Sequence, residues 1–291
     1  MLFKSVLLSL LLVCGSTAWG SVAFESAHVV VVDEQTGEVL LEKDAATAAP
    51  MASLTKLITA MVILDVQQDP NEMIRIEASD MDWLKHTHSG VPVGAVVARG
   101  TLLELALIAS DNHAAAALAR NHPGGLDGFV EASRRKIEAL GLERTTMDDP
   151  TGLSPNNHAS ALDLVKVLQA TLAYPLISEI TSKRAHAVVV NGRPWAVRNT
   201  NRLVGKPGWE ILASKTGFTN EAGRCLTMRL RAAGRTVIVV LMGAMASAER
   251  ALDALNIRRW LAGEAPLRAA PAPAHRPRAA ARKTRTVRAP A

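Results

Sequence analysis

Three short groups of polar residues in this sequence combine the side chains that nucleophilic catalysis needs. They are Ser53-Leu54-Thr55-Lys56, Ser110-Asp111-Asn112 and Lys215-Thr216-Gly217, in that order along 291 residues. About one Ser-x-x-Lys is expected by chance in a chain of this length, whereas each of the other two groups is expected at only a few per cent. The three groups in this order therefore arise by accident in roughly one chain in 1000, and together they indicate a single site.

The spacing of Ser53 and Lys56 suits a nucleophile and its base. An apolar-rich pattern predicts one long helix over residues 51–66, in which side chains three residues apart share a face. A serine hydroxyl is scarcely ionised at neutral pH and needs a base, and a lysine amine can serve when it is neutral. Burial and a second cation, for which Lys215 is the candidate, favour the neutral amine. The N-terminus of the helix also favours negative charge that develops at Ser53.

Strand patterns at the two ends of the body enclose a helical block. Residues 27–33 and 38–43 flank Thr36-Gly37 and predict a β-hairpin. Helical patterns follow at residues 51–66, 101–109, 113–120, 128–140 and 161–174, and Gly141 is a good stop signal after the fourth.

Strands return after residue 184. Residues 186–190 and 195–198 flank Asn191-Gly192, which is a strong hairpin signal. Three further strands are predicted at 211–216, 225–231 and 236–242, before a terminal amphipathic helix at 247–261. The order predicts one mixed sheet built from both ends of the chain, an all-helical insert over about 51–180, and a cleft where the two parts meet.

The three groups of residues are the signature of class A β-lactamases and penicillin-binding proteins. With them in place, residues 27–260 resemble the low-molecular-weight penicillin-binding proteins of the serine D-Ala-D-Ala peptidase family. Residues 113–120, 149–154 and 220–223 look like that family too. Residues 123–125 and 199–203 are most similar to its D-alanyl-D-alanine endopeptidase branch, which cuts D-Ala–meso-diaminopimelate cross-links in murein.

The resemblance implies a β-lactamase/transpeptidase-like fold of the mixed α/β class. Such a fold has a mainly antiparallel sheet flanked by helices and an all-helical subdomain, with the active site in the cleft between them. The peptidase domain is expected to span residues 24–264.

The resemblance also implies roles for the motif residues. Ser53 attacks the D-Ala carbonyl and forms an acyl-enzyme, Lys56 takes its proton, and Ser110 relays a proton to the leaving amine. The substrate-binding residues are Asn112, Lys215, Thr216, Gly217 and Phe218. Among them, Asn112 holds the stem backbone, Lys215 and Thr216 grip the substrate's carboxylate or its surroundings, and the N–H groups of Ser53 and Phe218 form the oxyanion hole. Asp111 is expected to point away and hold its loop.

The expected partners are therefore peptidoglycan stem peptides and, as covalent inhibitors that trap Ser53, β-lactam antibiotics. No cofactor and no metal are implied. His86-Thr87-His88 near Asp80 and Asp82 is a weak metal pattern without His-Glu-x-x-His, and it is more simply a surface loop. Nucleic acid is excluded as a partner, because aromatic residues are only 3% of the chain and no nucleic-acid-binding motif is present.

Some positions depart from the family pattern. Ser133-Arg134 stands where Met-Asn is usual, Met147 replaces a common Phe, and Gly90 stands where an Arg usually follows Ser89. Because Gly90 lies near a rim that selects substrate, the branch of the family is left open at this stage. Absence of a second C-terminal domain and of an amphipathic anchor favours the endopeptidase over the carboxypeptidase branch.

Three alternative functions remain. The first is a D-alanyl-D-alanine carboxypeptidase. The second is a β-lactamase, which would need a deacylating base such as the Glu in the Glu-x-x-Leu-Asn pattern of class A enzymes, and no such pattern is present. The third is a non-catalytic wall module that binds β-lactams.

The two ends of the sequence differ in character from the body. Residues 1–23 read as a signal peptide, with a short basic start and an apolar run over 6–13, so an exported, periplasmic protein is expected. Cys14 would leave with that peptide, and Cys225 is then a single thiol, most simply a small buried hydrophobe.

Residues 265–291 form a basic tail of Ala, Pro and Arg that is expected to be disordered. The formal net charge of the chain is +6, but without the seven basic residues of this tail and Lys4 the body has 25 basic and 27 acidic residues, a net charge of −2. The basic charge thus belongs to the tail, which is either a solvated extension or an attachment to anionic wall or membrane.

Overall fold

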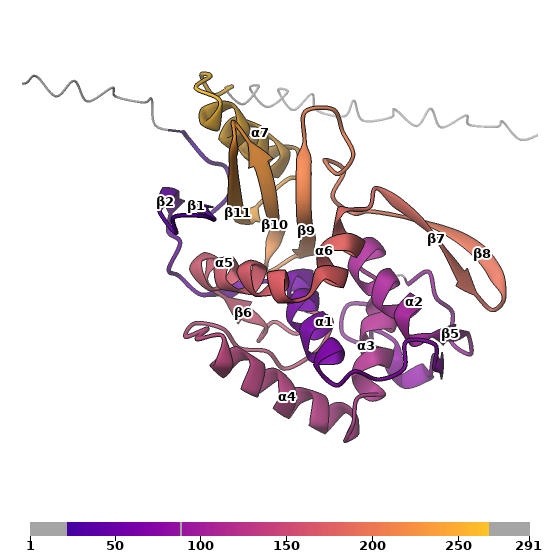
Figure 1. Cartoon of the computed structure of the whole chain (residues 1–291). Coiled ribbons are helices and arrows are strands. Elements are labelled where there is room, and N and C mark those ends of the chain that lie inside the picture. The colour runs from indigo at the N-terminus through magenta and orange to yellow at the C-terminus, as the bar shows by residue number, and fades with distance from the viewer. Residues whose placement is uncertain (1–21, 88, 268–291) are drawn as a thin grey trace, which may run out of the picture.

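The computed structural model describes residues 22–87 and 89–267 (Figure 1). Strands from both ends of the chain form a five-stranded antiparallel sheet in the order β2-β1-β11-β10-β9. Their bounds are β1 His28–Asp33, β2 Val39–Lys43, β9 Glu210–Thr219, β10 Gly223–Ala232 and β11 Arg235–Ala244. The predicted first hairpin and the three late strands are confirmed, and β9, which carries Lys215, Thr216 and Gly217, is an edge strand.

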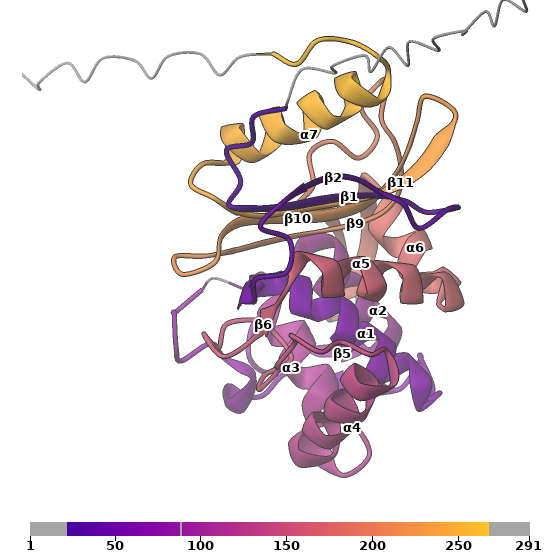
Figure 2. The ribbon, with the colours of Figure 1, turned by 90° about the vertical axis from the view of Figure 1, so that its left-hand side faces the viewer.

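Both faces of this sheet are covered (Figure 2). The helix α7 (Ser247–Leu261) lies on one face, and α5 (Ala161–Ala170) with the rest of the helical part lies on the other. Successive side chains of a strand point to opposite faces, so Val30 and Val32 join the core on the helical side, whereas Val29 and Val31 join the core under α7. Burial on both faces explains why β1 and β11 read as continuous apolar runs.

The helical part surrounds α1 (Lys56–Asp65), which continues from the 3₁₀ turn η1 (Ala52–Thr55). All residues of α1 from Lys56 to Ile63 are buried, so this helix is apolar on every side and forms the centre of its half. Around it lie α2 Arg99–Glu104, the π-helical turn η3 Leu105–Ala109, α3 Asn112–Arg120, α4 Gly125–Ala139, the turn η4 Thr171–Ala173 and α6 Pro175–Ser182. The base candidate Lys56 is therefore built into the most buried helix of the molecule.

The structure differs from the sequence expectation in the short elements. Residues 51–66 are not one helix, because Ala52 has a positive φ of 47° and the chain makes a 3₁₀ turn before α1 begins. The helical block also contains two small antiparallel pairs, β3 (Ala49–Pro50) with β6 (His158–Ala159) and β4 (Met73–Arg75) with β5 (Val96–Ala98). A further 3₁₀ turn, η2 (Ala78–Asp80), follows β4.

The predicted hairpin around Asn191-Gly192 is confirmed as β7 (Ala185–Val190) and β8 (Arg193–Arg198). Both turn residues have positive φ, 50° and 72°, as a two-residue hairpin turn requires. The hairpin forms a two-stranded sheet of its own, so it is not part of the sheet built from the ends of the chain.

Within the described ranges, no single helix is both long and apolar enough to cross a membrane. The bent pair of residues 161–173 and 175–182 reaches that length and composition only when taken together, and its apolar side chains Leu164, Leu168 and Ile177 are buried in the core.

Candidate active site

Ser53 lies in the 3₁₀ turn η1, directly after a strained residue. Ala52 adopts φ of 47°, a region that costs a residue with a side chain of order 1 kcal/mol or more. Such strain persists only where surrounding contacts hold it, and it is common where a nucleophile must be presented. The turn therefore aims Ser53 into the cleft in a way that an uninterrupted helix would not.

Lys56, the first residue of α1, is almost fully buried beside this serine. Its Nζ lies 3.1 Å from Ser53 Oγ, and it donates to Asn112 Oδ1 and to the carbonyl oxygen of Thr151, both at 2.7 Å. A neutral amine has two hydrogens and one lone pair, and here the two hydrogens satisfy the two closer oxygens. The lone pair is then left facing the hydroxyl of Ser53, which suits Lys56 to accept that proton.

Burial favours the neutral form of this amine. It lowers the pKa of Lys56 from 10.5 to about 8, although the carboxylates of Asp149, Asp111 and Asp82 act in the opposite direction. The sequence suggests the charge of Lys215 as an added cause, but burial is the cause that the structure supports. For Lys215, burial, and then the charges of Lys56 and Arg250, hold the pKa well below its usual range.

Ser110 lines the same cleft as Ser53. It ends the π-helical turn η3 in the left-handed conformation, with φ of 60°, and its Oγ accepts a hydrogen bond from Lys215 Nζ at 2.7 Å. Asp111 points away, as expected, because its carboxylate caps α3 at Ala114 N and accepts from Ser89 Oγ and Gly90 N. Two serine–lysine pairs therefore line the same cleft, Ser53 with Lys56 and Ser110 with Lys215.

The other predicted residues of β9 lie along this cleft in different ways. Thr216 Oγ1 donates to Thr200 Oγ1 at 2.7 Å, and the ring of Phe218 is 45% exposed. Gly217 allows the strand to approach η1, since a Cβ here would come within 3.0 Å of Ala52 Cβ and 3.1 Å of Ser53 N. Gly217 thus lines the cleft mainly by leaving room for the backbone of the nucleophile.

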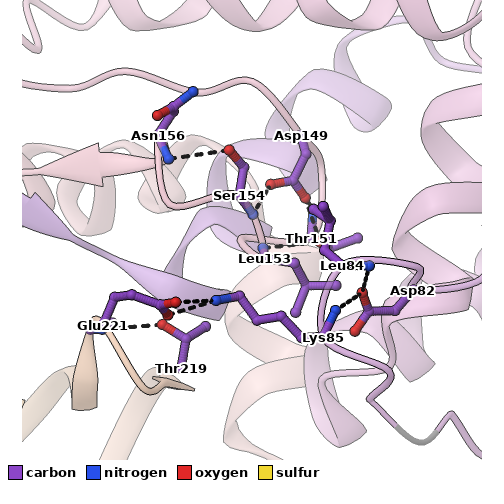
Figure 3. A network of polar contacts seen from close by, with 11 residues as sticks. Asp82, Leu84, Lys85, Asp149, Thr151, Leu153, Ser154, Asn156, Thr219 and Glu221 are labelled. Atoms are coloured by element: carbon purple, nitrogen blue, oxygen red, sulfur yellow. Dashed lines mark hydrogen bonds and ion pairs between the residues drawn. The ribbon is translucent and has the colours of Figure 1, made fainter.

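The loop of residues 149–154 contacts Lys56, and Figure 3 shows the polar contacts that shape this loop. The carboxylate of Asp149 accepts from the backbone N–H groups of Thr151, Gly152 and Ser154. The resulting tight loop presents the carbonyl oxygen of Thr151 to Lys56 and that of Pro150 to Thr59. The motif that resembles the family at residues 149–154 therefore has a structural role next to the base.

Gly152 is the residue of this loop that tolerates no side chain. It has φ of 84°, and a Cβ would come within 1.9 Å of Ala52 O and 2.9 Å of Thr55 Oγ1. We expect Gly152→Ala to lower the free energy of unfolding by about 2–4 kcal/mol and to slow β-lactam acylation, because Thr151 and Ala52 must both move. Urea unfolding and labelling kinetics check this result.

Gly37→Ala is the matched control for that substitution. Gly37 has a similar φ of 73°, but nothing lies within 4 Å of the position that an added methyl group would take. It should cost only about 1 kcal/mol, the price of the backbone conformation alone. Equal losses in the two variants would contradict the steric argument for Gly152.

Both ends of the side-chain amide of Asn112 already have hydrogen-bond partners. Its Oδ1 faces Lys56, and its Nδ2 donates to Thr87 Oγ1 at 2.7 Å, while Thr87 itself donates to Asp82 Oδ2. Since Thr87 takes only one of the two hydrogens on Asn112 Nδ2, a substrate carbonyl can accept the second, with the amide held in place by Thr87 and Lys56. The sequence offered no signal for Thr87 other than its place between two histidines.

A surface ion pair ties the loop that carries Thr87 to the sheet. Lys85 Nζ lies 2.6 Å from both carboxylate oxygens of Glu221, in the turn between β9 and β10 (Figure 3). Asp82 closes the same loop by accepting from the backbone of Leu84 and Lys85. The helical part and the sheet are thus joined next to the cleft by an exposed contact.

The acidic residues near His86 already have partners. Asp80 pairs with Arg120, and Asp82 accepts hydrogen bonds from its own loop, while His88 lies outside the described residues. In the part of the chain that the structure describes, no group of three His, Cys, Asp or Glu side chains is arranged to hold a metal ion.

The departure at Gly90 has a packing reason. A Cβ at this position would come within 2.4 Å of the ring of Trp195 on β8, so the indole fills the space that a side chain would need.

Two other positions noted in the sequence are buried. Ser133 donates a hydrogen bond to Phe129 O, and Cys225 is a free thiol, as predicted.

The cleft itself has a volume of about 610 Å³ and continues from the serines toward α7. It brings together Ser53, Ser110, Thr216, Gly217 and Phe218 with residues that the sequence analysis did not assign to the site. The additional lining residues include Thr200, Arg202, Lys206, Arg224 and Arg250. Three further predicted residues contact this centre. Lys56 contacts Ser53, and Asn112 contacts Lys56. Lys215 contacts Ser110. The predicted site residues are therefore all brought together.

A nucleophilic serine with a buried lysine, faced by a second serine–lysine pair between an antiparallel sheet and a helical half, defines a serine acyl-transfer enzyme of the penicillin-binding class. The chain belongs to the D-alanyl-D-alanine carboxypeptidase family, whose sequence model matches residues 16–246. This membership confirms the prediction of a hydrolase that acts on D-Ala-D-Ala peptides.

Individual relatives agree with this assignment. The chain is 40% identical to the D-alanyl-D-alanine endopeptidase of Pseudomonas aeruginosa and 37% identical to that of Escherichia coli, each over 238 residues, or 81% of this chain and 77% of the relative. The solved D-alanyl-D-alanine carboxypeptidase of Mycobacterium tuberculosis superposes with a TM-score of 0.73 and 25% identity, over 83% of this chain and 93% of that one. The predicted fold class is confirmed by this structural similarity.

Proposed function

We propose that this chain is a serine DD-peptidase that hydrolyses D-Ala–meso-diaminopimelate cross-links in peptidoglycan through an acyl-enzyme on Ser53. The observation that carries the proposal is the pair of short contacts from Lys56 to Ser53 and from Lys215 to Ser110 within one cleft. The Pseudomonas and Escherichia relatives, both named endopeptidases, support the choice of cross-links as substrate.

In the acylation step, Lys56 Nζ takes the hydroxyl proton of Ser53 while Ser53 Oγ forms a bond to the D-Ala carbonyl carbon. The carbonyl oxygen becomes an oxyanion, and the N–H groups of Ser53 and Phe218 stabilise it, each by about 3–4 kcal/mol. The tetrahedral intermediate collapses as the C–N bond breaks. The leaving amine takes the hydroxyl proton of Ser110, whose Oγ is held by Lys215. The proton that Lys56 accepted from Ser53 then passes to Ser110 Oγ, so Lys56 is neutral again before deacylation.

In the deacylation step, water adds to the ester carbonyl and loses its proton to the neutral Lys56. The ester bond then breaks, and Ser53 Oγ regains a proton from Lys56. A β-lactam opens on Ser53 in the same way as the peptide, but its leaving nitrogen stays attached to the acyl group. We infer that this retained group slows the entry of water, so β-lactams act as covalent inhibitors.

Arg250 and Thr216 are suited to the carboxylate next to the scissile bond. Arg250 is largely buried at the cleft, with its Nη1 fixed by the carbonyl oxygen of Cys225 at 2.9 Å, and Thr216 Oγ1 lies on the same wall. Both a terminal D-Ala and a diaminopimelate residue offer a carboxylate there. This part of the site is therefore common to the endopeptidase and carboxypeptidase reactions.

Digestion of defined muropeptides with mass detection tests the proposal. The expected result is conversion of cross-linked dimers to monomers, with slower release of terminal D-Ala from pentapeptides. Release of D-Ala with intact dimers would instead favour the carboxypeptidase. Rapid turnover of a chromogenic cephalosporin would indicate a β-lactamase, and penicillin labelling without any cleavage would indicate a binding module.

We further propose that the protein acts in the periplasm after removal of residues 1–23, and that residues 265–291 attach it to anionic wall or membrane. The proposal rests on the sequence patterns, since residues 1–21 and 268–291 lie outside the described ranges. Fractionation of full-length protein and of a variant without residues 265–291 checks both points: unchanged retention on washed envelopes at low salt would remove the attachment idea.

A further inference from the structure

One wall of the cleft carries an excess of positive charge. Arg202, Lys206, Arg224 and Arg250 all line the same hollow as Ser53. None of the four forms an ion pair with a carboxylate of residues 22–87 or 89–267, whereas other arginines of the sheet do, such as Arg229 with Glu34. Unpaired cations that converge on a cleft are suited to an anionic ligand.

The positive wall lies on the leaving-group side of the scissile bond. Ser110, which we propose delivers the proton to the leaving amine, lines this hollow, and Thr216 joins it to Thr200. Asn112 and Thr151 instead line a separate hollow of about 370 Å³ with the apolar side chains of Trp83 and Leu84. The cations thus face what departs after acylation, and the apolar hollow faces the acyl group.

Two of the four cations already have a local function. Arg250 is partly buried and its Nη1 donates to the carbonyl oxygen of Cys225, and the guanidinium of Arg224 stacks on the ring of Phe218 with 3.5 Å between its central carbon and the ring centre. Arg202 and Lys206 are different, because they are exposed and make no hydrogen bond or ion pair with any side chain that the structure describes.

The turn that carries Arg202 and Lys206 is well held. Asn201 is buried, and its side chain and backbone accept from Leu203 N and Val204 N, while Lys206 N donates to Leu203 O. Thr200 N is also bonded to Ile108 O of the π-helical turn that ends at Ser110. The backbone that carries the two cations is therefore fixed relative to the catalytic serines.

We propose that Arg202 and Lys206 form a second anion subsite, which binds a carboxylate of the leaving peptide remote from the scissile bond. The inference rests on the proposed endopeptidase function and deepens it. A terminal D-Ala leaves with a single carboxylate, for which Arg250 and Thr216 are sufficient. A leaving peptide from a cross-link carries further carboxylates, and only such a substrate can use the second subsite.

Three synthetic substrates test the subsite. All three have the same acyl part and differ in the leaving group. In the first the leaving group is a diaminopimelate peptide with a free remote carboxylate, and in the second that carboxylate is a carboxamide. In the third the leaving group is D-Ala. We expect wild-type kcat/KM to be about tenfold larger for the free acid than for the carboxamide, as two exposed ion pairs would give. The preference should shrink in 0.5 M salt, because exposed charges are then screened within a few ångströms.

The double variant Arg202→Gln/Lys206→Gln should reduce the preference to about one. The matched control is Arg193→Gln/Arg198→Gln, which removes the same charge from exposed positions of β8 outside the cleft and should keep the tenfold ratio. An unchanged ratio in the first variant, or no preference in the wild type, overturns the subsite. Release of D-Ala without cleavage of either diaminopimelate substrate overturns the proposed function, and the subsite with it.

Discussion

Replacement of Ser53 by alanine is expected to abolish covalent labelling by a β-lactam and to reduce muropeptide cleavage by roughly 10⁵- to 10⁶-fold. The variant lacks the only atom that forms the acyl bond in the proposed mechanism. The loss should come without unfolding, since among residues 22–87 and 89–267 the Ser53 hydroxyl has one side-chain hydrogen bond, with Lys56. Gel fluorescence with a labelled penicillin and the thermal unfolding midpoint measure the two quantities.

Ser178→Ala is the matched control, because Ser178 lies on α6 outside the cleft. In the part of the chain that the structure describes, its hydroxyl makes no hydrogen bond with a residue of the proposed mechanism. It should label as the wild type does. Stoichiometric labelling of Ser53→Ala would show that another residue is the nucleophile. Ser110 is then the first candidate, since it is the other serine of the cleft held by a lysine.

The sequence was informative about the catalytic centre because its chemistry depends on short, dense motifs. Ser53 and Lys56 are three residues apart, so a single helical turn brings them together whatever the rest of the chain does. The late strands were equally clear, since turn signals such as Asn191-Gly192 and Ala233-Gly234 separate strongly apolar runs, and these turn residues have the expected positive φ.

The remaining features depend on contacts between distant segments, which no local pattern encodes. Ala52 and Ser110 adopt left-handed conformations only because β9, the loop at Gly152 and the π-helical turn surround them. Thr87 was read as a surface loop residue, yet it reaches Asn112. Arg250 appeared as one more charged residue of a terminal helix, and only the packing of α7 beside β10 places it in the cleft.

The same packing explains how one family site can serve two reactions. In the proposed mechanism, the two serine–lysine pairs and Arg250 act on groups that every D-Ala peptide offers. Arg202 and Lys206 line the same cleft, and we propose that only a larger leaving group contacts them. We infer that the choice between a terminal D-Ala and a cross-link is made in the segment of residues 199–206, which also carries the sequence similarity to the endopeptidase branch.

The rate of acylation is expected to rise with pH, to reach half of its maximum near pH 8 and to level off above that value. The proposed base is the neutral amine of Lys56, and burial lowers its pKa to about 8, so the neutral fraction increases as pH rises through that value. At pH 6 about one molecule in 100 has the neutral amine, against about half at pH 8. The second-order rate constant for β-lactam acylation, measured between pH 5.5 and 9, should therefore rise close to tenfold per unit below pH 7.

The variant Lys56→Arg separates this proton transfer from a simple need for positive charge. A guanidinium keeps its charge at every pH in this range and cannot accept the proton of Ser53, so acylation should fall by about 10³-fold and lose its rise toward pH 8. Circular dichroism shows whether the buried site accommodates the larger side chain. If the variant does not fold, the pH profile of the wild type still tests whether Lys56 is the base. An acylation rate that is flat between pH 6 and 8 is incompatible with a base of pKa about 8. A normal rate in a folded Lys56→Arg would instead make Lys56 a fixed cation and transfer the role of base to Lys215, the other buried amine of the cleft, whose pKa is also lowered.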